Sequence, residues 1–338
     1  MTKNFIESTL VKEDLTFEIP LRPQCLNDFI GQEQIRDRLE VLIGAAKQRG
    51  ETLGHCLFSG PPGLGKTTLA NILAQAMGTN LVVTSGPVIE KAGDLAGILT
   101  SLKIGDVLFI DEIHRLNRSI EEYLYQAMED FTLDIMIDSG PSARSIQVKL
   151  NKFTLTGATT RLGLLSEPLR SRFALTCRLD YYDPLILKKI IQRTGRLLNV
   201  DLDEHTALEI GKRSRGTPRV ANHLLRWIRD YAQMRANNKI DKEVVDRALQ
   251  MLAIDHIGLD EMDKKILQVM IDHYGGGPVG LNAIAACIGE ESSTIEEVYE
   301  PYLILQGLLR RTSRGREVTE TGYKHMEAFP LTKENDIN

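Results

Sequence analysis

A glycine-rich loop between an apolar run and a helical pattern constrains this fold more than any other segment. Residues 60–68 read Gly-Pro-Pro-Gly-Leu-Gly-Lys-Thr-Thr and match the pattern Gly-x-x-x-x-Gly-Lys-Ser/Thr. The run His55–Phe58 predicts a short buried strand before the loop, and Thr67–Met77 predicts a helix that ends at Gly78. In this order of elements, backbone N–H groups and a helix N-terminus converge on the phosphates of a nucleotide.

Two motifs carry the residues expected to bind and hydrolyse ATP. We expect Lys66 to hold the β- and γ-phosphates and Thr67 to bind Mg²⁺. The apolar strand Val107–Ile110 is followed by Asp111 and Glu112. We expect Asp111 to bind Mg²⁺ through water and Glu112 to polarise the attacking water. Together the motifs predict an ATP hydrolase with ATP and Mg²⁺ at its site.

The composition bounds the class of protein. The chain has 338 residues, which suggests two or three domains, and its 42% hydrophobic and 26% charged content is typical of a globular protein. Because it has no run of about 18 apolar residues and starts with polar residues, we expect no membrane span or signal peptide and predict a cytoplasmic protein. Its four scattered cysteines argue against zinc or disulfides. Because the chain has a net charge of −5, any contact with nucleic acid must come from a local basic patch.

Periodicity divides the chain into three parts. From about residue 17 to residue 181, short apolar runs alternate with helical patterns, as in a parallel sheet with helices on both faces. Leu81–Thr84 and Phe153–Ala158 are further expected strands. Asp183-Pro184 and Thr217-Pro218 are typical helix starts and predict a small helical domain. We therefore predict a large α/β P-loop domain over residues 1–181, a small helical lid domain over 182–254, and a third domain over 255–338.

The third domain has the pattern of a winged helix. The first two helices are expected over Met262–His273 and Leu281–Ile288. A third helix is expected to begin with a capping box formed by Ser293 and Glu296. A hairpin follows, with strands Leu308–Thr312 and Glu317–Thr321 and a turn at 313–316. The polar tail after Pro330 is expected to be disordered.

The hairpin of this domain is basic in an otherwise acidic protein. It carries Arg310, Arg311, Arg314 and Arg316. Such a cluster suits contact with the phosphates of duplex DNA, and a solvated basic turn has the same composition. No aromatic platform accompanies the arginines, which favours the duplex backbone over stacking on single strands.

Polar and basic residues follow the strand Phe153–Ala158. Thr159 and Thr160 come at its end, where a hydroxyl would sense the γ-phosphate. Arg170 or Arg172 could be an arginine finger that reaches the nucleotide of the next subunit, or an ordinary surface arginine. Arg219 is expected in the first turn of a helix, where a cation is unfavourable and an anionic partner is therefore expected. Its functional interpretation is a second nucleotide sensor.

A helicase of superfamily 2 is an alternative. Asp111-Glu-Ile-His114 matches its Asp-Glu-x-His box, and the segment Gln192–Arg196 resembles its arginine motif. That class places the arginine motif in a second full α/β domain, for which the intervening chain is too short. We expect Arg193 and Arg196 to lie on the solvated face of a helix instead.

The combined motifs resemble those of AAA+ ATPases and, more closely, of the RuvB family of bacterial Holliday junction branch migration motors. The likeness spans nearly the whole chain and rests on Leu21-Arg-Pro23, Phe29-Ile-Gly-Gln32, Gly60–Thr68, Thr84-Ser-Gly-Pro87, Glu90-Lys-Ala-Gly-Asp94, Leu108–Arg115, Gly157–Arg161, Arg215–Arg219, Gly276–Gly280, Ile288–Glu291 and Glu300–Leu303. The resemblance implies a homo-hexameric, ATP-driven ring on double-stranded DNA at Holliday junctions. It also implies RuvA and a RuvC-type resolvase as partners, and a role in recombination, DNA repair and the SOS response.

The resemblance assigns further residues. It implies nucleotide contacts by Leu21, Arg22, Gly63, Gly65, Lys66, Thr67, Thr68, Glu129, Asp130, Phe131, Arg172, Tyr182 and Arg219, with Arg172 as the preferred finger. Arg311 and Arg316 match DNA-contacting arginines. Ser292 stands where the family often has an arginine, which puts a DNA contact there in doubt.

The segment 133–148 predicts a β-hairpin with its turn at 139–142. Ile146 and Val148 are two positions apart and therefore share one face of the expected strand, which could pack on the core. The family instead implies a protruding hairpin that docks RuvA. The chief rival function is that of an AAA+ replication-origin initiator, a nucleotide-switched DNA-binding protein that also joins an AAA+ domain to a winged helix. A clamp-loader subunit is a further alternative, which the C-terminal winged helix disfavours.

Overall fold

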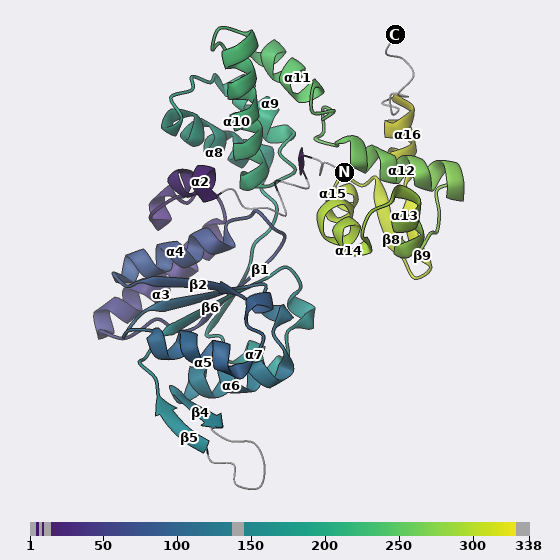
Figure 1. Cartoon of the computed structure of the whole chain (residues 1–338). Coiled ribbons are helices and arrows are strands. Elements are labelled where there is room, and N and C mark those ends of the chain that lie inside the picture. Colours follow the sequence, from purple (N-terminus) through teal and green to yellow (C-terminus); the bar gives the residue numbers. More distant parts are fainter. Residues whose placement is uncertain (1–4, 7–8, 10–14, 137–144, 329–338) are drawn as a thin grey trace. The chain divides into compact units, whose positions relative to one another are not determined.

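The computed structural model describes residues 5–6, 9, 15–136 and 145–328 (Figure 1). The chain forms two compact units, one of residues 22–181 and one of residues 1–21 with 182–338. The segment 1–21, predicted as part of the ATPase domain, thus groups with the C-terminal part of the chain. The predicted turn at 139–142 and the tail after Pro330 lie outside the described residues.

Residues 22–181 form a parallel sheet between two layers of helices (Figure 1). The strand order is β2-β3-β6-β1-β7, for β1 Cys56–Ser59, β2 Leu81–Ser85, β3 Val107–Asp111, β6 Thr154–Thr159 and β7 Leu175–Arg178. The helices are α3 Glu33–Arg49, α4 Lys66–Met77, α5 Ala92–Ser101, α6 Arg118–Glu129 and α7 Glu167–Ser171. A separate antiparallel hairpin pairs β4 Thr132–Met136 with β5 Ser145–Lys149. The predicted fold class is confirmed.

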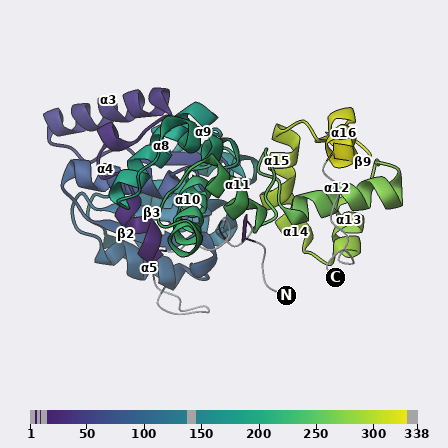
Figure 2. The ribbon, with the colours of Figure 1, turned by 90° about the horizontal axis from the view of Figure 1, so that it is seen from above.

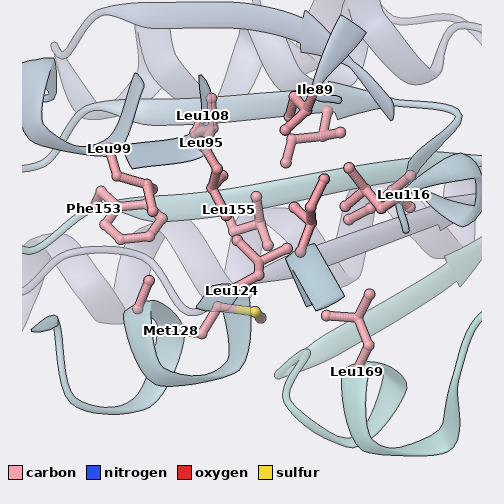
Figure 3. Packing of buried hydrophobic residues seen from close by; sticks show 14 of the residues in the cluster. Ile89, Leu95, Leu99, Leu108, Leu116, Leu124, Met128, Phe153, Leu155 and Leu169 are labelled. Atoms are coloured by element: carbon pink, nitrogen blue, oxygen red, sulfur yellow. The ribbon is translucent and has the colours of Figure 1, made fainter. Parts of the chain in front are cut away.

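Alternating residues of the interior strand β3 face the two helix layers. Leu108 and Ile110 belong to a buried cluster that includes Leu95 of α5 and Leu124 of α6 (Figure 3). Phe109, between them, packs with Ala70 of α4 on the other face. A strand covered on both faces is continuously apolar, and this pattern was the sequence signal for β3.

The other unit is mostly helical. A short helix α2 Leu15–Glu18 accompanies α8 Pro184–Leu197, α9 Glu204–Lys212, α10 Pro218–Arg235 and α11 Lys242–Gln250. Asp183 and Thr217 cap α8 and α10 with their side chains, as predicted. Arg193 was expected in solvent, but it is half-buried, because its Nη1 donates to the Leu21 carbonyl at 2.7 Å. No helix among the described residues is long and apolar enough to cross a membrane.

The C-terminal part is a winged helix, seen from above in Figure 2, in which α12 packs against β9 and α16, and α15 packs against β8. Its helices are α12 Glu261–Tyr274, α13 Leu281–Ile288, α14 Ser292–Thr294, α15 Glu300–Leu305 and α16 Glu320–Ala328, with a π-helical turn Ile295–Tyr299 between α14 and α15. The wing pairs β8 Leu309–Thr312 with β9 Gly315–Val318.

Two predicted boundaries here are wrong. The third helix begins at Ser292 with Glu291 at its N-cap, so Ser293 lies inside the helix, where its hydroxyl donates to Glu291. The second wing strand ends at Val318, because the Thr319 hydroxyl accepts the Gly322 N–H and starts α16. The turn of the wing is therefore shorter than predicted.

Candidate functional site

The loop after β1 has the backbone that phosphate binding requires. Gly60, Gly63 and Gly65 all have positive φ angles. A Cβ on Gly60 would lie 2.3 Å from the Leu179 carbonyl oxygen, so only glycine fits there. Gly65 is the N-cap of α4 and has no side chain to satisfy the first N–H groups of that helix. The loop thus presents a helix N-terminus to an anion.

Lys66 lies buried within this loop, with 7% of its surface exposed. Its Nζ donates to the carbonyls of Gly60 at 2.8 Å and Pro61 at 2.9 Å. Phosphate oxygens are stronger acceptors for an ammonium than neutral carbonyls are. The residues present therefore fit the triphosphate of a nucleotide, with Thr68 buried behind them in the first turn of α4.

Oxygen donors lie at the carboxyl edge of the same sheet. Asp111 ends β3, and its carboxylate accepts the Glu112 N–H at 3.0 Å. Thr67 is in the first turn of α4. A hydroxyl and one carboxylate fit Mg²⁺, which usually completes its shell with water and substrate phosphates. Among the described residues, no group of three or more His, Cys, Asp or Glu side chains that could hold a metal occurs.

Glu112 is fixed in a left-handed backbone conformation, with φ of 45°. One carboxylate oxygen, Oε2, accepts the Thr160 N–H at 3.3 Å and the Thr160 hydroxyl at 3.1 Å. Burial raises the pKa of Glu112, but hydrogen bonds from His114 and Thr160 and the charge of Lys66 lower it, and the net shift is downward. Glu112 is therefore ionised at neutral pH and can polarise a water molecule.

His114 joins this group, and the sequence prediction gave it no role. Its Nδ1 lies 3.1 Å from Glu112 Oε2 and 2.9 Å from the hydroxyl of the buried Thr159. Both candidate sensor threonines thus reach the glutamate, Thr160 directly and Thr159 through the imidazole. The Asp-Glu-x-His spacing was the available signal for this contact.

The two candidate finger arginines differ in their surroundings. Arg170 is exposed on α7, whereas 22% of the Arg172 side chain is exposed. Arg172 donates to the Pro168 carbonyl at 2.6 Å and to Glu129 at 3.2 Å, and its guanidinium lies over the ring of Tyr125. The structure therefore holds Arg172 in a defined orientation.

Two of the predicted nucleotide-contacting residues, Asp130 and Phe131, directly follow Glu129, the last residue of α6. Asp130 is the exposed C-cap of that helix. Phe131 has a positive φ angle of 51°, and its ring packs edge-on against Phe153 with centroids 5.9 Å apart. Arg22 is partly exposed in the same unit.

The remaining predicted nucleotide contacts lie in the other unit. Leu21 and Tyr182 are buried, and the Tyr182 N–H donates to the Gly216 carbonyl at 2.8 Å. Arg219 is in the first turn of α10, and its Nε lies 3.3 Å from a carboxylate oxygen of Glu18. The anionic partner that the helix dipole led us to expect is thus supplied within the chain, by a residue that the sequence did not single out.

The wing arginines share a buried carboxylate. Arg311 and Arg316 face each other across β8 and β9, and two like charges in that position repel. Glu300, which is 1% exposed, accepts the Nε of Arg311 at 2.6 Å and the Nε of Arg316 at 3.0 Å, and also accepts the Nη2 of both. The Glu300 hydrogen bonds raise the pKa of Arg311 against the effect of burial. The two arginines are therefore held as a fixed pair. Arg310 instead pairs with Glu317 at the exposed side.

The hairpin β4–β5 has an exposed apolar side chain. Ile146 is 52% exposed and Val148 is half-buried, so Ile146 does not face the core.

Ser292, at the position where the family often has an arginine, donates its hydroxyl to the Asn282 amide oxygen at 2.8 Å.

Comparison with protein families covers nearly the whole chain. Residues 21–179 match the Holliday junction DNA helicase RuvB P-loop domain, residues 182–255 the RuvB AAA lid domain, and residues 256–327 the RuvB C-terminal winged helix domain.

Individual relatives agree with these matches. The chain is 79% identical over 326 residues to the Holliday junction branch migration complex subunit RuvB of Protochlamydia amoebophila, covering 96% of this chain and 98% of that protein. It is 56% identical over 319 residues to the subunit of the same name from Chlamydia felis, covering 94% and 95%. Among solved structures, the Thermotoga maritima RuvB Holliday junction branch migration motor matches with a TM-score of 0.84 and 52% identity, over 91% of this chain and 98% of that one.

Proposed function

The chain belongs to the RuvB family of Holliday junction branch migration motors, and we propose that it converts ATP hydrolysis at the loop Gly60–Thr68 into branch migration during recombination and DNA repair. The observation that carries this proposal is a buried lysine in that loop together with a glutamate that hydrogen bonds hold at the neighbouring sheet edge. Lys66 lies among the loop carbonyls, and the neighbouring sheet edge holds Glu112 through Thr160.

The residues of this edge have separate roles. Lys66 and the N–H groups of the loop bind the phosphates, and Thr67 and Asp111 hold Mg²⁺, Asp111 through water. Bound Mg²⁺ would neutralise charge on the β- and γ-phosphates. Glu112 orients the attacking water, while Thr159 and Thr160 couple the state of the γ-phosphate to that glutamate.

Further contacts complete the nucleotide site. We assign Arg172, rather than the exposed Arg170, as the finger that acts on the nucleotide of the next subunit. Arg219 is assigned as the second nucleotide sensor. The other contacts are Leu21, Arg22, Gly63, Gly65, Thr68, Glu129, Asp130, Phe131 and Tyr182.

The proposed assembly is a cytoplasmic homo-hexamer on double-stranded DNA. Arg311 and Arg316 contact phosphates, because they form the basic pair of the wing. Ile146 and Val148 on the hairpin β4–β5 dock RuvA, since a large exposed apolar side chain at a hairpin suits a protein partner. A RuvC-type resolvase would then cut the migrated junction.

Mixed rings test the finger assignment. Arg172→Ala and Lys66→Ala should each be inactive, whereas mixtures of the two should regain ATPase activity, because an intact Arg172 then faces an intact pocket. Arg170→Ala is the matched control and should keep most activity. Absence of recovery in rings whose co-assembly is verified would refute the trans role of Arg172, and a larger loss at Arg170 would transfer the role there.

A further inference from the structure

Arg172 needs support from outside its own helix. It is the C-cap residue of α7, a helix of five residues, and a long flexible side chain at such an end has no preferred direction. A finger is effective only when its charge is aimed before the transition state forms. The residues that fix Arg172 therefore matter to the reaction.

Tyr125 supplies one wall of this support. The guanidinium carbon of Arg172 lies 4.7 Å from the centre of the Tyr125 ring, within the range of a cation–π interaction. The Pro168 carbonyl and the Glu129 carboxylate accept hydrogen bonds from the two terminal nitrogens. The ring thus bounds one side of the guanidinium, and the two acceptors hold its terminal nitrogens.

The ring is itself anchored. Glu121, Tyr125 and Glu129 are spaced at four-residue intervals along α6 and share one face of that helix. The Tyr125 hydroxyl donates to Glu121 Oε2 at 2.8 Å, and the same oxygen accepts the Ser166 hydroxyl at 2.5 Å. Glu121 is 4% exposed, so two hydroxyl protons satisfy a buried carboxylate.

Ser166 connects this anchor to the helix that carries the finger. It is the N-cap of α7, where its hydroxyl oxygen accepts the Leu169 N–H at 3.4 Å. Its oxygen also lies 2.8 Å from the Tyr125 hydroxyl. The start of α7 is therefore tied to the aromatic residue against which the arginine at the end of α7 rests.

We propose that Tyr125 is a positioning residue that aims the Arg172 guanidinium at the nucleotide of the neighbouring subunit. The inference rests on the proposed trans role of Arg172. Tyr125 acts through its ring face and does not contact the nucleotide itself. Loss of the ring should therefore lower kcat and leave the affinity of the subunit's own pocket for ATP unchanged.

Two substitutions separate the ring from the hydroxyl. Tyr125→Phe and Tyr125→Leu both remove the hydroxyl, and only Tyr125→Leu removes the aromatic face. We expect Tyr125→Phe to keep kcat within about threefold of wild type and Tyr125→Leu to lower it about tenfold, which corresponds to about 1.4 kcal/mol of activation free energy. Tyr123→Leu on the same helix is the matched control and should keep kcat. Equal kcat values for the two Tyr125 variants would overturn the proposal.

Mixed rings distinguish a misaimed finger from a damaged subunit. Tyr125→Leu subunits have an intact pocket, so mixing them with Lys66→Ala subunits, which have an intact finger, should raise activity above the average of the two. Mixing them with Arg172→Ala subunits should not. If Arg172→Ala and Lys66→Ala complement each other but Tyr125→Leu and Lys66→Ala do not, Tyr125 does not act on the finger. If neither pair complements, the trans role of Arg172 fails first and the inference fails with it.

Discussion

Replacing Asp263 by asparagine should destabilise the junction between the helical domain and the winged helix. Arg215, in the loop before α10, is paired with Asp263 of α12, and the two side chains are 2% and 0% exposed. The arginine donates Nη1 to one Asp263 oxygen at 2.5 Å and Nη2 to the other at 3.3 Å, and it lies 4.4 Å from the centre of the Tyr302 ring. Burial and the nearby Asp263 raise the pKa of Asp260 well above its ordinary value. Asp263 is the carboxyl group that accepts both hydrogen bonds from the Arg215 guanidinium.

The size of the effect follows from burial. Removing one partner of a buried ion pair leaves an uncompensated charge and costs about 3–5 kcal/mol. Asparagine keeps an oxygen that can accept the Asp260 N–H, a bond of 3.1 Å, so the cap of α12 survives and the loss reports the charge. For a unit of this size, about 2–4 °C of melting temperature is lost per kcal/mol, so Asp263→Asn should lower Tm by about 6–20 °C.

Calorimetric melting of the full chain measures this loss. Asp272→Asn, on the exposed part of the same helix, is the matched control and should change stability by less than about 0.5 kcal/mol. The double variant Arg215→Met/Asp263→Leu should recover much of the loss, because it buries no lone charge. The reasoning is refuted if Asp263→Asn costs less than about 1 kcal/mol, or if the double variant melts well below the single one.

Three further predictions concern ATP, acid and the partner. Lys66→Ala should abolish ATP binding or turnover, whereas Glu112→Gln should bind ATP normally and stay in the ATP state; wild-type turnover in Glu112→Gln would remove its catalytic role. Burial raises the pKa of Asp255, but a hydrogen bond from His325 is the next largest influence, and the net shift is downward. The ionised Asp255 carboxylate therefore stabilises the folded state. This contribution is fully present above the ordinary aspartate pKa of about 3.9, and it is lost as the pH falls through the lower pKa that Asp255 has in the folded protein. His325→Ala should therefore raise the pH of acid unfolding, and an unchanged midpoint in circular dichroism would contradict this. Ile146→Asp should weaken RuvA binding in titration calorimetry without lowering DNA-independent ATPase activity, and unchanged affinity would exclude this side chain from the interface.

Local patterns made most of the fold predictable. The loop Gly60–Thr68 and the strand before Asp111 need only neighbouring residues to form, so sequence reasoning found them. The edge strand β7 was missed, because Thr176 and Arg178 are exposed and leave no continuous apolar run. Helix α16 was not predicted, because a threonine such as Thr319 is equally common in a strand and at the start of a helix.

The contacts that orient the site were not predictable in this way. Glu300 and Arg311 meet through the packing of a helix against a hairpin, and Tyr125 meets Arg172 through the packing of α6 against α7. Such pairs have no fixed spacing in sequence. Arg193 shows the converse, since a helix position that looked solvated is covered by the carbonyl of Leu21, which is remote in sequence.

The wing offers the most direct test of the account, which holds that ATP hydrolysis moves DNA through a basic pair. Removing Arg311 and Arg316 alone would leave Glu300 buried without their charges, so the variant to use is Arg311→Ala/Arg316→Ala/Glu300→Gln, with Glu300→Gln alone as control. The measurement is dissociation of a synthetic four-way junction with ATP and RuvA, alongside DNA-free ATPase activity and duplex binding over a salt series. We predict near wild-type basal hydrolysis, a salt slope reduced by about one log unit for each DNA phosphate that the variant no longer neutralises, and little junction movement. Junction movement and duplex binding at wild-type levels across the salt series would contradict the account.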